Sequence, residues 1–292
     1  MKAGIIDIGS NTIRYMEAYW DGRKLCAGHK SLYATRLAEG IIHTGKLSDE
    51  AVNRSIGALR EIIRRSNGTT LYAYATSAVR DAVNGKDFVK LVRKSLGLVV
   101  EVLSGEREGR YAYMGAAGEG ALIDIGGGST QLVDGGLRLS WPLGCVRAKD
   151  YAQTAGGGPL AVWREPLREV MLSIIQPFEI GGRRLTGVGG TITTLAALAL
   201  ELNQFSALNV HGYRLDLESI RELIRRLDNL GASGRRGHPL LGTRHDVILP
   251  GAVILEYLME RLGANDIHVS ESDGMEGYFM HMVAAREGAL RP

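Results

Sequence analysis

The chain has 292 residues, of which 45% are hydrophobic, 6% aromatic and 23% charged. This composition is typical of a soluble globular protein large enough for two domains, and its only cysteines, Cys26 and Cys145, exclude a disulfide framework and a zinc site. The formal charge of +3 is too small to indicate a nucleic-acid-binding protein, although it permits an anionic small molecule or polyanion as ligand.

The first part of the chain begins with signals for antiparallel strands. A buried strand is expected over residues 3–8, a second over 12–20 after a Gly-Ser-Asn turn, and a third over 24–34 after the hairpin dipeptide Asp21–Gly22. Helices and strands then alternate. We expect a helix over 48–66 capped by Ser48, a strand over 70–76, a helix over 87–97 stopped by Gly97, a strand over 98–103 and a helix over 106–118.

The same pattern then starts again. A strand over 121–125, a glycine turn and a hairpin over 130–141 are followed by helical segments, interrupted by a loop at 154–159. Later elements are a strand, glycine turn and helix within 183–200, a helix over 215–231 capped by Asp216, a polar basic loop over 232–246, a helix over 246–263, a strand over 266–270 and a last helix over 272–288. The sequence therefore predicts two α/β domains, residues 1–117 and 118–292.

Two similar turns open the two domains. IDIGSNT (6–12) and IDIGGGST (123–130) each place an aspartate at the end of an apolar run, and Asp7 and Asp124 are 117 residues apart. The glycines allow backbone N–H groups to converge on an anion, and hydroxyl and amide side chains add donors. One such turn could be a simple hairpin corner, but its recurrence favours a phosphate site. The candidate ligands are Gly9, Ser10, Asn11, Thr12, Gly126, Gly127, Gly128, Ser129 and Thr130.

A third glycine turn lies in LTGVGGT (185–191). It joins a strand to the start of a helix, where N–H groups and the positive end of the helix dipole favour a phosphate. Glycine at such a junction is also common for packing alone. After two phosphate turns, however, Gly189, Gly190 and Thr191 fit a nucleotide or an extended phosphate chain.

Together these motifs closely resemble the exopolyphosphatase and guanosine pentaphosphate phosphohydrolase (Ppx/GppA) family, within the actin, sugar kinase and heat-shock chaperone ATPase superfold. The resemblance spans nearly the whole chain. It rests on IDIGSNT (6–12), ATSAVRDAVNG (75–85), LSGEREGRYAYMGA (103–116), IDIGGGST (123–130), PLGCVR (142–147), GVGGT (187–191), DVILPGAVIL (246–255) and VSESDGMEG (269–277). It implies an α/β fold of two ribonuclease H-like domains with a central cleft, and a last helix that packs back on the first domain.

The resemblance also implies roles for individual residues. Glu108 matches the catalytic glutamate that orients or deprotonates the attacking water, whereas Glu106 can be explained as a first-turn acid that stabilises its helix. Arg80 matches a phosphate-binding arginine, although on its own it would read as a solvated helix residue. Arg147 is a weaker phosphate candidate. Asp7 and Asp124 would hold Mg²⁺, the expected cofactor.

Three features depart from the family pattern. Gln131 stands where the motif usually ends in a glutamate that helps to hold metal or water, so one negative charge is lost near Asp124. The segment Gly274–Gly277 lacks the arginine common there. The chain also has no additional helical domain with a His-Asp metal pair, so a short two-domain form is expected, with shorter polyphosphates or a nucleotide as substrate.

The expected function is a Mg²⁺-dependent phosphohydrolase acting on the terminal phosphate of polyphosphate or guanosine pentaphosphate (pppGpp), between which the sequence does not choose. The alternatives are an ATPase or kinase of the same superfold, and a non-catalytic alarmone sensor, which Gln131 favours. No nucleic-acid polymer and no membrane partner is expected, and a homodimer is left open. A cytoplasmic location is expected, because the first apolar run is short and acidic and residues 195–202 are too few to cross a bilayer.

Overall fold

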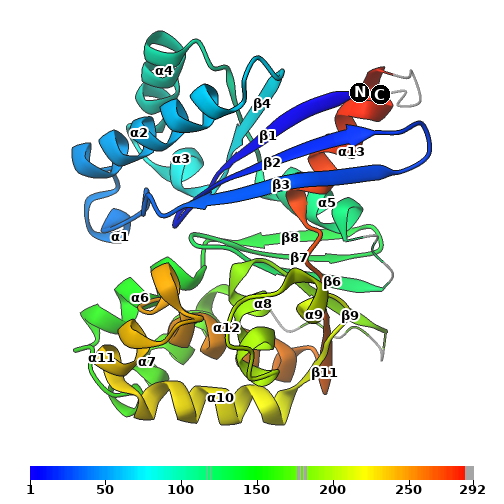
Figure 1. The fold of residues 1–292 in the computed structure, drawn as a ribbon. Helices are drawn as coiled ribbons and strands as arrows, with labels where there is room; N and C mark the ends of the chain where they lie inside the picture. Colours follow the sequence, from blue (N-terminus) through cyan, green and yellow to red (C-terminus); the bar gives the residue numbers. More distant parts are fainter. Residues whose placement is uncertain (117, 119, 176–177, 179, 181–182, 287–292) are drawn as a thin grey trace. The chain divides into compact units, whose positions relative to one another are not determined.

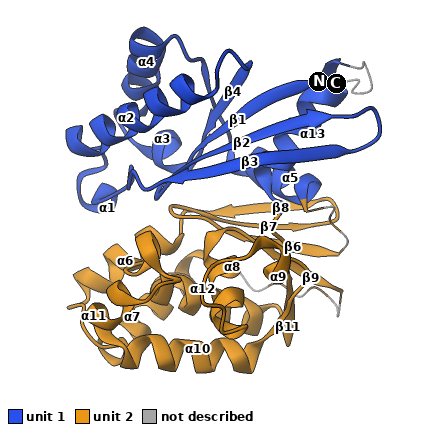
Figure 2. Ribbon diagram, viewed as in Figure 1, with its two compact units in different colours: residues 1–115, 272–292 blue, residues 116–271 orange. Residues whose placement is uncertain are grey.

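The computed structural model describes residues 1–116, 118, 120–175, 178, 180 and 183–286. The chain divides into two compact units (Figure 2). Unit 1 contains residues 1–115 and 272–292, and unit 2 contains residues 116–271. Residue 117, where the sequence analysis ended the first domain, lies outside the described residues, as does the end of the last expected helix, residues 287–288.

Unit 1 is built on a five-stranded sheet with the order β3-β2-β1-β4-β5 (Figure 1). The first three strands are antiparallel neighbours, whereas β4 and β5 run parallel to β1. The central strand β1 is buried over six of its seven residues, as its continuous apolar run requires. The bounds are β1 (Lys2–Ile8), β2 (Ile13–Trp20), β3 (Leu25–Tyr33), β4 (Leu71–Ala75) and β5 (Val100–Val102).

The helices of unit 1 follow the expected local signals. Ser48 caps α2 by accepting a hydrogen bond from the N–H of Ala51, and Gly97 ends α4 in the left-handed conformation. Two short helices, α1 and α3, lack such signals, and no bounds were predicted for them, although Arg80 of α3 was considered as a helix residue. The bounds are α1 (Ile41–Thr44), α2 (Asp49–Arg65), α3 (Ser77–Asp81), α4 (Gly85–Leu96), α5 (Gly105–Gly115) and α13 (Gly274–Arg286).

The last helix, α13, packs closely on α5 within unit 1. The contact depends on two glycines, because a Cβ at Gly277 would collide with the carbonyl of Tyr111 and one at Gly115 with the carbonyl of Asp273. Tyr278 extends the contact, with its ring 5.3 Å from that of Tyr111 and nearly perpendicular to it. Helix α13 therefore belongs to the core of unit 1, although it comes last in the sequence.

Unit 2 repeats this sheet with one addition. Its order is β10-β11-β9-β6-β7-β8, so that β8-β7-β6-β9-β11 corresponds to β3-β2-β1-β4-β5, and β10 is an extra antiparallel edge strand. Strand β10 was not predicted from the sequence, because its three residues directly precede a capped helix. The bounds are β6 (Ala121–Ile125), β7 (Thr130–Asp134), β8 (Leu137–Trp141), β9 (Leu185–Val188), β10 (Arg214–Asp216) and β11 (Asp266–Val269).

Helices α8 and α12 form the buried centre of unit 2, together with the sheet. The expectation of a loop over 232–246 is wrong in part, since this segment contains α11 and a 3₁₀ turn. Arg235 stabilises α11 by donating to the carbonyl of Leu227 at the end of α10 (2.6 Å). The bounds are α6 (Cys145–Thr154), α7 (Leu160–Ile174), α8 (Gly190–Ala199), α9 (Ala207–Val210), α10 (Leu217–Asn229), α11 (Gly231–Gly237), η1 (Gly242–Arg244) and α12 (Ile248–Arg261). Among the described residues, no helix has the length and apolar character needed to cross a bilayer.

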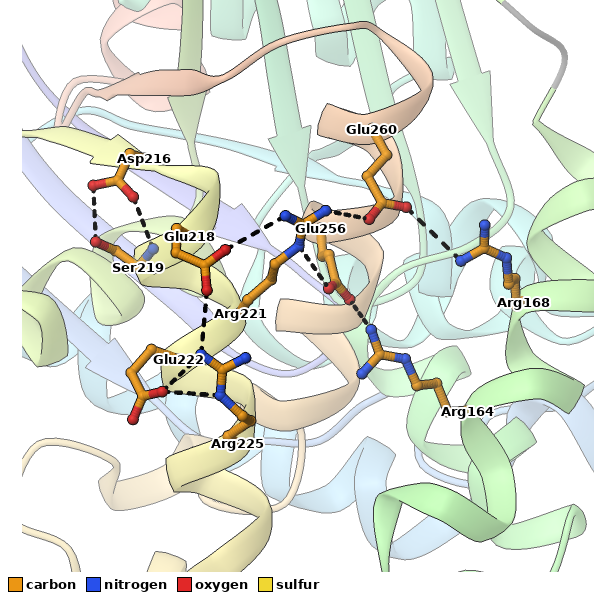
Figure 3. A network of polar contacts seen from close by, with 10 residues as sticks. All are labelled: Arg164, Arg168, Asp216, Glu218, Ser219, Arg221, Glu222, Arg225, Glu256 and Glu260. Carbon is orange, nitrogen blue, oxygen red and sulfur yellow. Dashed lines mark hydrogen bonds and ion pairs between the residues drawn. The ribbon is translucent and has the colours of Figure 1, made fainter.

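A network of ion pairs joins α7, α10 and α12 (Figure 3). The buried carboxylate of Glu256 on α12 contacts Arg164 of α7 (2.7 Å) and Arg221 of α10 (3.6 Å), and Glu260 contacts Arg221 (2.9 Å). Leaving a buried carboxylate such as Glu256 unpaired would be costly, so these arginines are held in structural pairs. These arginines therefore have structural partners and need no ligand to account for them.

Candidate phosphate site

In unit 1, three predicted site residues lie at or after the carboxyl ends of three parallel strands: the metal ligand Asp7, the phosphate-binding Arg80 and the catalytic Glu108. Asp7 is the penultimate residue of β1, Arg80 lies in α3 directly after β4, and Glu108 lies in α5 after β5. These strands are neighbours in the sheet, and in open α/β sheets ligands bind at this edge. The fold thus brings Asp7, Arg80 and Glu108 to one edge of unit 1.

The first phosphate turn, residues 9–12, is held by its carbonyl groups. The N–H of Gly9 donates to the carbonyl of Thr12 (3.0 Å), and the carbonyls of Ser10 and Asn11 accept from Ala38 (2.9 Å) and Arg36 (2.8 Å). Ser10, Asn11 and Thr12 are buried. The amide nitrogen Nδ2 of Asn11 has no hydrogen-bond partner within the described part of the chain. The turn therefore offers an unused buried donor, as an anion site requires.

Asp7 is paired with Arg14, which the sequence analysis missed. The two residues lie directly opposite each other in the β1–β2 hairpin, and Oδ2 of Asp7 accepts from Nε (3.0 Å) and Nη2 (2.5 Å) of Arg14. Oδ1 of Asp7 is buried and has no partner among the described residues. Burial raises the pKa of Asp7, and the charge of Arg14 opposes that shift. The hairpin spacing alone could have indicated this pair.

Arg80 and Glu108 form an ion pair. Nη1 of Arg80 donates to Oε2 of Glu108 (3.1 Å) and to the carbonyl of Leu103 (2.9 Å). The Glu108 side chain is 14% exposed and that of Arg80 24% exposed, so both are partly shielded from water. Glu106 is exposed to solvent instead. Arg80 is therefore not a freely solvated helix residue.

The second phosphate turn, in unit 2, repeats the geometry of the first. The N–H of Gly126 donates to the carbonyl of Ser129 (3.0 Å), as Gly9 does to Thr12. The carbonyls of Gly126 and Gly127 accept from the N–H groups of Cys145 (3.0 Å) and Val146 (2.8 Å) at the start of α6. In both units, carbonyls of the turn are bound by protein donors. Fixing the carbonyls in this way orients the backbone of the turn, as an anion-binding turn requires.

Two of the predicted residues near this turn have structural contacts. The hydroxyl of Thr130 is buried and donates to the carbonyl of Leu143 (2.5 Å). Arg147 lies in the first turn of α6, where its backbone N–H is 3.4 Å from the carbonyl of Gly127 and its Nη1 is 3.4 Å from that of Pro142. Gly128 is buried within the same turn.

Gln131 is completely buried and lies opposite Asp124 in the β6–β7 hairpin. Its Nε2 donates to the hydroxyls of Ser129 (2.8 Å) and Ser140 (3.2 Å). Its Oε1 is buried without a hydrogen-bond partner among the residues described. Gln131 therefore presents an unused oxygen on the strand next to Asp124.

The third turn lies beside Asp124 in unit 2. Gly189 has a φ of 90°, and a Cβ there would lie 2.6 Å from Oδ1 of Asp124, so no other residue fits easily. A Cβ at Gly190 would collide with the guanidinium of Arg244, and Thr191 is buried behind it. Arg244 was predicted only as part of a basic loop, because no local sequence signal indicates that it lies against the start of α8.

The donor set limits how a metal ion could be held. No group of three His, Cys, Asp or Glu side chains suited to a metal occurs within the described residues. Mg²⁺ commonly binds through one or two carboxylates, with waters and substrate phosphates completing its shell. The carboxylate of Asp124 and the unpaired Oε1 of Gln131 are oxygen donors that fit such a partial site.

Comparison with known proteins identifies the family. Residues 27–286 match the Ppx/GppA phosphatase family. Exopolyphosphatase 2 of Mycobacterium tuberculosis is 31% identical over 312 aligned positions, which cover 94% of this chain and 97% of that protein. Exopolyphosphatase 1 of Mycobacterium leprae is 30% identical, with coverage of 92% and 86%. The Ppx/GppA structure from Aquifex aeolicus is 28% identical with a TM-score of 0.77, and the match covers 98% of both chains.

These matches span both units, and the repeated sheet order agrees with the actin-like ATPase superfold to which the matched structures belong. The resemblance noted in the sequence is therefore confirmed, as is the α/β fold of two such units. The chain belongs to the Ppx/GppA phosphatase family.

Proposed function

We propose that this protein is an exopolyphosphatase that releases the terminal phosphate of inorganic polyphosphate, and that pppGpp is a second substrate. The observation that carries the proposal is the ion pair between Arg80 and Glu108 at the strand edge that also holds Asp7 and the first phosphate turn. The names of the curated relatives support polyphosphate, since two of them at about 30% identity are exopolyphosphatases.

In this proposal the two glycine turns bind phosphate oxygens through backbone N–H groups, and Asn11 adds its unused amide. Glu108 positions and deprotonates the attacking water, because hydrolysis of a phosphoanhydride requires an in-line nucleophile and neutralisation of charge. Arg80 orients the Glu108 carboxylate by a charge-assisted hydrogen bond, and its remaining donors can contact a phosphate. Within unit 2, Arg244 and the start of α8 would bind phosphate groups.

Mg²⁺ fits this arrangement as a metal held partly by the substrate. In unit 2, Asp124 and Oε1 of Gln131 would hold the ion. In unit 1, Oδ1 is the carboxylate oxygen that Asp7 could offer to a metal, because its Oδ2 is bound by Arg14. The bound ion would neutralise charge on the phosphate oxygens. A sensor that binds phosphate without turnover is the second candidate, and its support is the neutral side chain at position 131.

The test is phosphate release in the presence of Mg²⁺, with short polyphosphate, long polyphosphate, pppGpp and ATP as substrates. Wild type is compared with Glu108→Gln and with Glu106→Gln, a control on the same helix whose side chain is exposed. We expect release from polyphosphate that Glu108→Gln abolishes and Glu106→Gln preserves. Release from ATP alone would instead indicate an ATPase. Binding of polyphosphate or pppGpp without release would indicate a sensor.

A further inference from the structure

Arg14 lies between two carboxylates from distant parts of the chain. It donates to Asp7 of β1 through Nε and Nη2, and to Oδ2 of Asp273 through Nη1. These bonds use three of the five N–H donors of the guanidinium. The Arg14 side chain remains 29% exposed, whereas those of Asp7 and Asp273 are 10% and 9% exposed. One cation at the edge of the first phosphate turn is thus shared by two anions.

Asp273 is held rigidly in the position where it meets Arg14. It caps α13, since its Oδ1 accepts from the N–H of Met275 (3.0 Å), while its own N–H donates to Glu276 (2.9 Å). Glu276 is fixed in turn by Lys30 of β3 (2.6 Å). With Oδ1 bound by the helix, Oδ2 is the oxygen that contacts Arg14. The cap of α13 therefore presents one carboxylate oxygen to Arg14.

The corresponding position of unit 2 lacks this cation. Gln131 stands opposite Asp124 as Arg14 stands opposite Asp7, with the same separation of 117 residues. In unit 1, the arginine next to the phosphate turn is also paired with a second carboxylate, that of Asp273. Two charges about 4 Å apart interact strongly in a partly buried site. The negative charge of Asp273 therefore changes the electrostatic attraction between Arg14 and a bound anion.

We propose that Asp273 is a positioning residue of the phosphate site that acts through Arg14: it fixes the guanidinium against Asp7 and competes with ligand phosphate for its charge. The inference rests on the proposed function in one respect, namely that the anion at the first turn is a phosphate. It predicts that the wild-type protein binds phosphate more weakly, and releases it more readily, than a variant in which Asp273 is replaced.

The test removes the charge of Asp273 while retaining the helix cap. Asparagine caps helices as well as aspartate does, so Asp273→Asn leaves α13 capped, while its Nδ2 replaces the oxygen that accepts from Arg14. Asp273→Ser is a second, smaller capping variant without the carboxylate. Asp216→Asn, at the cap of α10 in unit 2, is the matched control. Orthophosphate is the probe, because its binding can be measured by calorimetry without turnover.

We expect Asp273→Asn and Asp273→Ser to bind orthophosphate about tenfold more tightly and to lower the KM for polyphosphate more than they change kcat. Asp216→Asn should have the orthophosphate affinity and the KM for polyphosphate of the wild type. In an Arg14→Gln background, Asp273→Asn should no longer change phosphate binding, because the residue through which it acts is gone.

A lower unfolding midpoint with unchanged phosphate affinity would assign Asp273 a structural role only and overturn the inference. Weaker binding, or no measurable binding by any variant, would also overturn it. If the affinity difference is present but no variant hydrolyses polyphosphate, the proposed function fails while the inference stands.

Discussion

Gln131 lies directly opposite Asp124 in the β6–β7 hairpin, and its Oε1 is buried without a hydrogen-bond partner among the described residues. A glutamate at this position would place two carboxylates side by side. In the absence of metal they repel, whereas a bound divalent cation would be stabilised by both. The identity of this one side chain should therefore decide how strongly unit 2 holds Mg²⁺.

Gln131→Glu should lower the half-saturating Mg²⁺ concentration for phosphate release by about tenfold, equivalent to about 1.4 kcal/mol, and raise turnover. In EDTA the variant should melt at a lower temperature than wild type. Gln204→Glu, at an exposed position of unit 2, is the control. An unchanged Mg²⁺ dependence would exclude Gln131 from the metal site.

Arg80→Lys should reduce kcat/KM by about tenfold to a hundredfold. Lysine keeps the positive charge but cannot contact Glu108 and the carbonyl of Leu103 with the geometry of a guanidinium. If Arg80 acts partly by orienting Glu108, Arg80→Lys should reduce kcat/KM much less in a Glu108→Gln background than in the wild type. Arg110→Lys, exposed on the same helix as Glu108, is the control in steady-state assays. Equal effects in both backgrounds would show that the two residues act independently.

Gly190→Ala should raise the KM for polyphosphate by about tenfold with little loss of stability, because the new methyl group would displace the guanidinium of Arg244. The end of a flexible side chain can move aside, so the fold should tolerate the change. Gly237→Ala, where a methyl group meets no neighbour within 4 Å, is the control. A normal KM in Gly190→Ala would remove Arg244 from the proposed site.

Gly277→Ala should destabilise unit 1 by about 1–3 kcal/mol or more, because the methyl group would collide with the backbone carbonyl of Tyr111, which cannot move independently of α5. Gly57→Ala, within α2 and in open space, should instead stabilise by about 0.5–1 kcal/mol through its higher helix propensity. Urea unfolding monitored by circular dichroism measures both. Equal stability of the two variants would show that α5 and α13 can move apart to accommodate the methyl group at little cost in free energy.

The stability contributed by Asp273 should depend on pH. Burial opposes ionisation of this carboxyl, but the charge and hydrogen bond of Arg14 and the N–H of Met275 outweigh it and lower its pKa. A carboxyl whose pKa is lower in the folded than in the unfolded protein stabilises the folded protein at pH values above the unfolded pKa of about 3.9. This stabilisation is lost as the pH falls through the folded-state pKa. Asp273→Asn should therefore be less stable than wild type at pH 7, and the difference should narrow below about pH 4. A constant difference in urea midpoint would contradict this.

Much of the fold could be read from local patterns. The β1–β2 and β6–β7 hairpins are marked by apolar runs that end in aspartate and glycine turns, and the α2 and α10 caps by Ser48 and Asp216. The glycine turns were predicted to be phosphate sites because they recur, and the recurrence is also visible in the sequence. Short elements such as β10 and α11 could not be predicted from the sequence, because they are stabilised by neighbouring segments. Strand β10 pairs with β11, and the side chain of Arg235 stabilises α11.

The sequence by itself determined the family, the two α/β halves and the residue types that can hold phosphate, because hydrophobic periodicity, turn chemistry and short motifs are local properties of the chain. Only the tertiary structure decided how these residues are paired. Arg14 and Asp273 are 259 positions apart, and Arg244 reaches Gly190 from a separate segment. Such contacts depend on which strands and helices pack together, and that is set by the burial of the whole sheet rather than by any local signal.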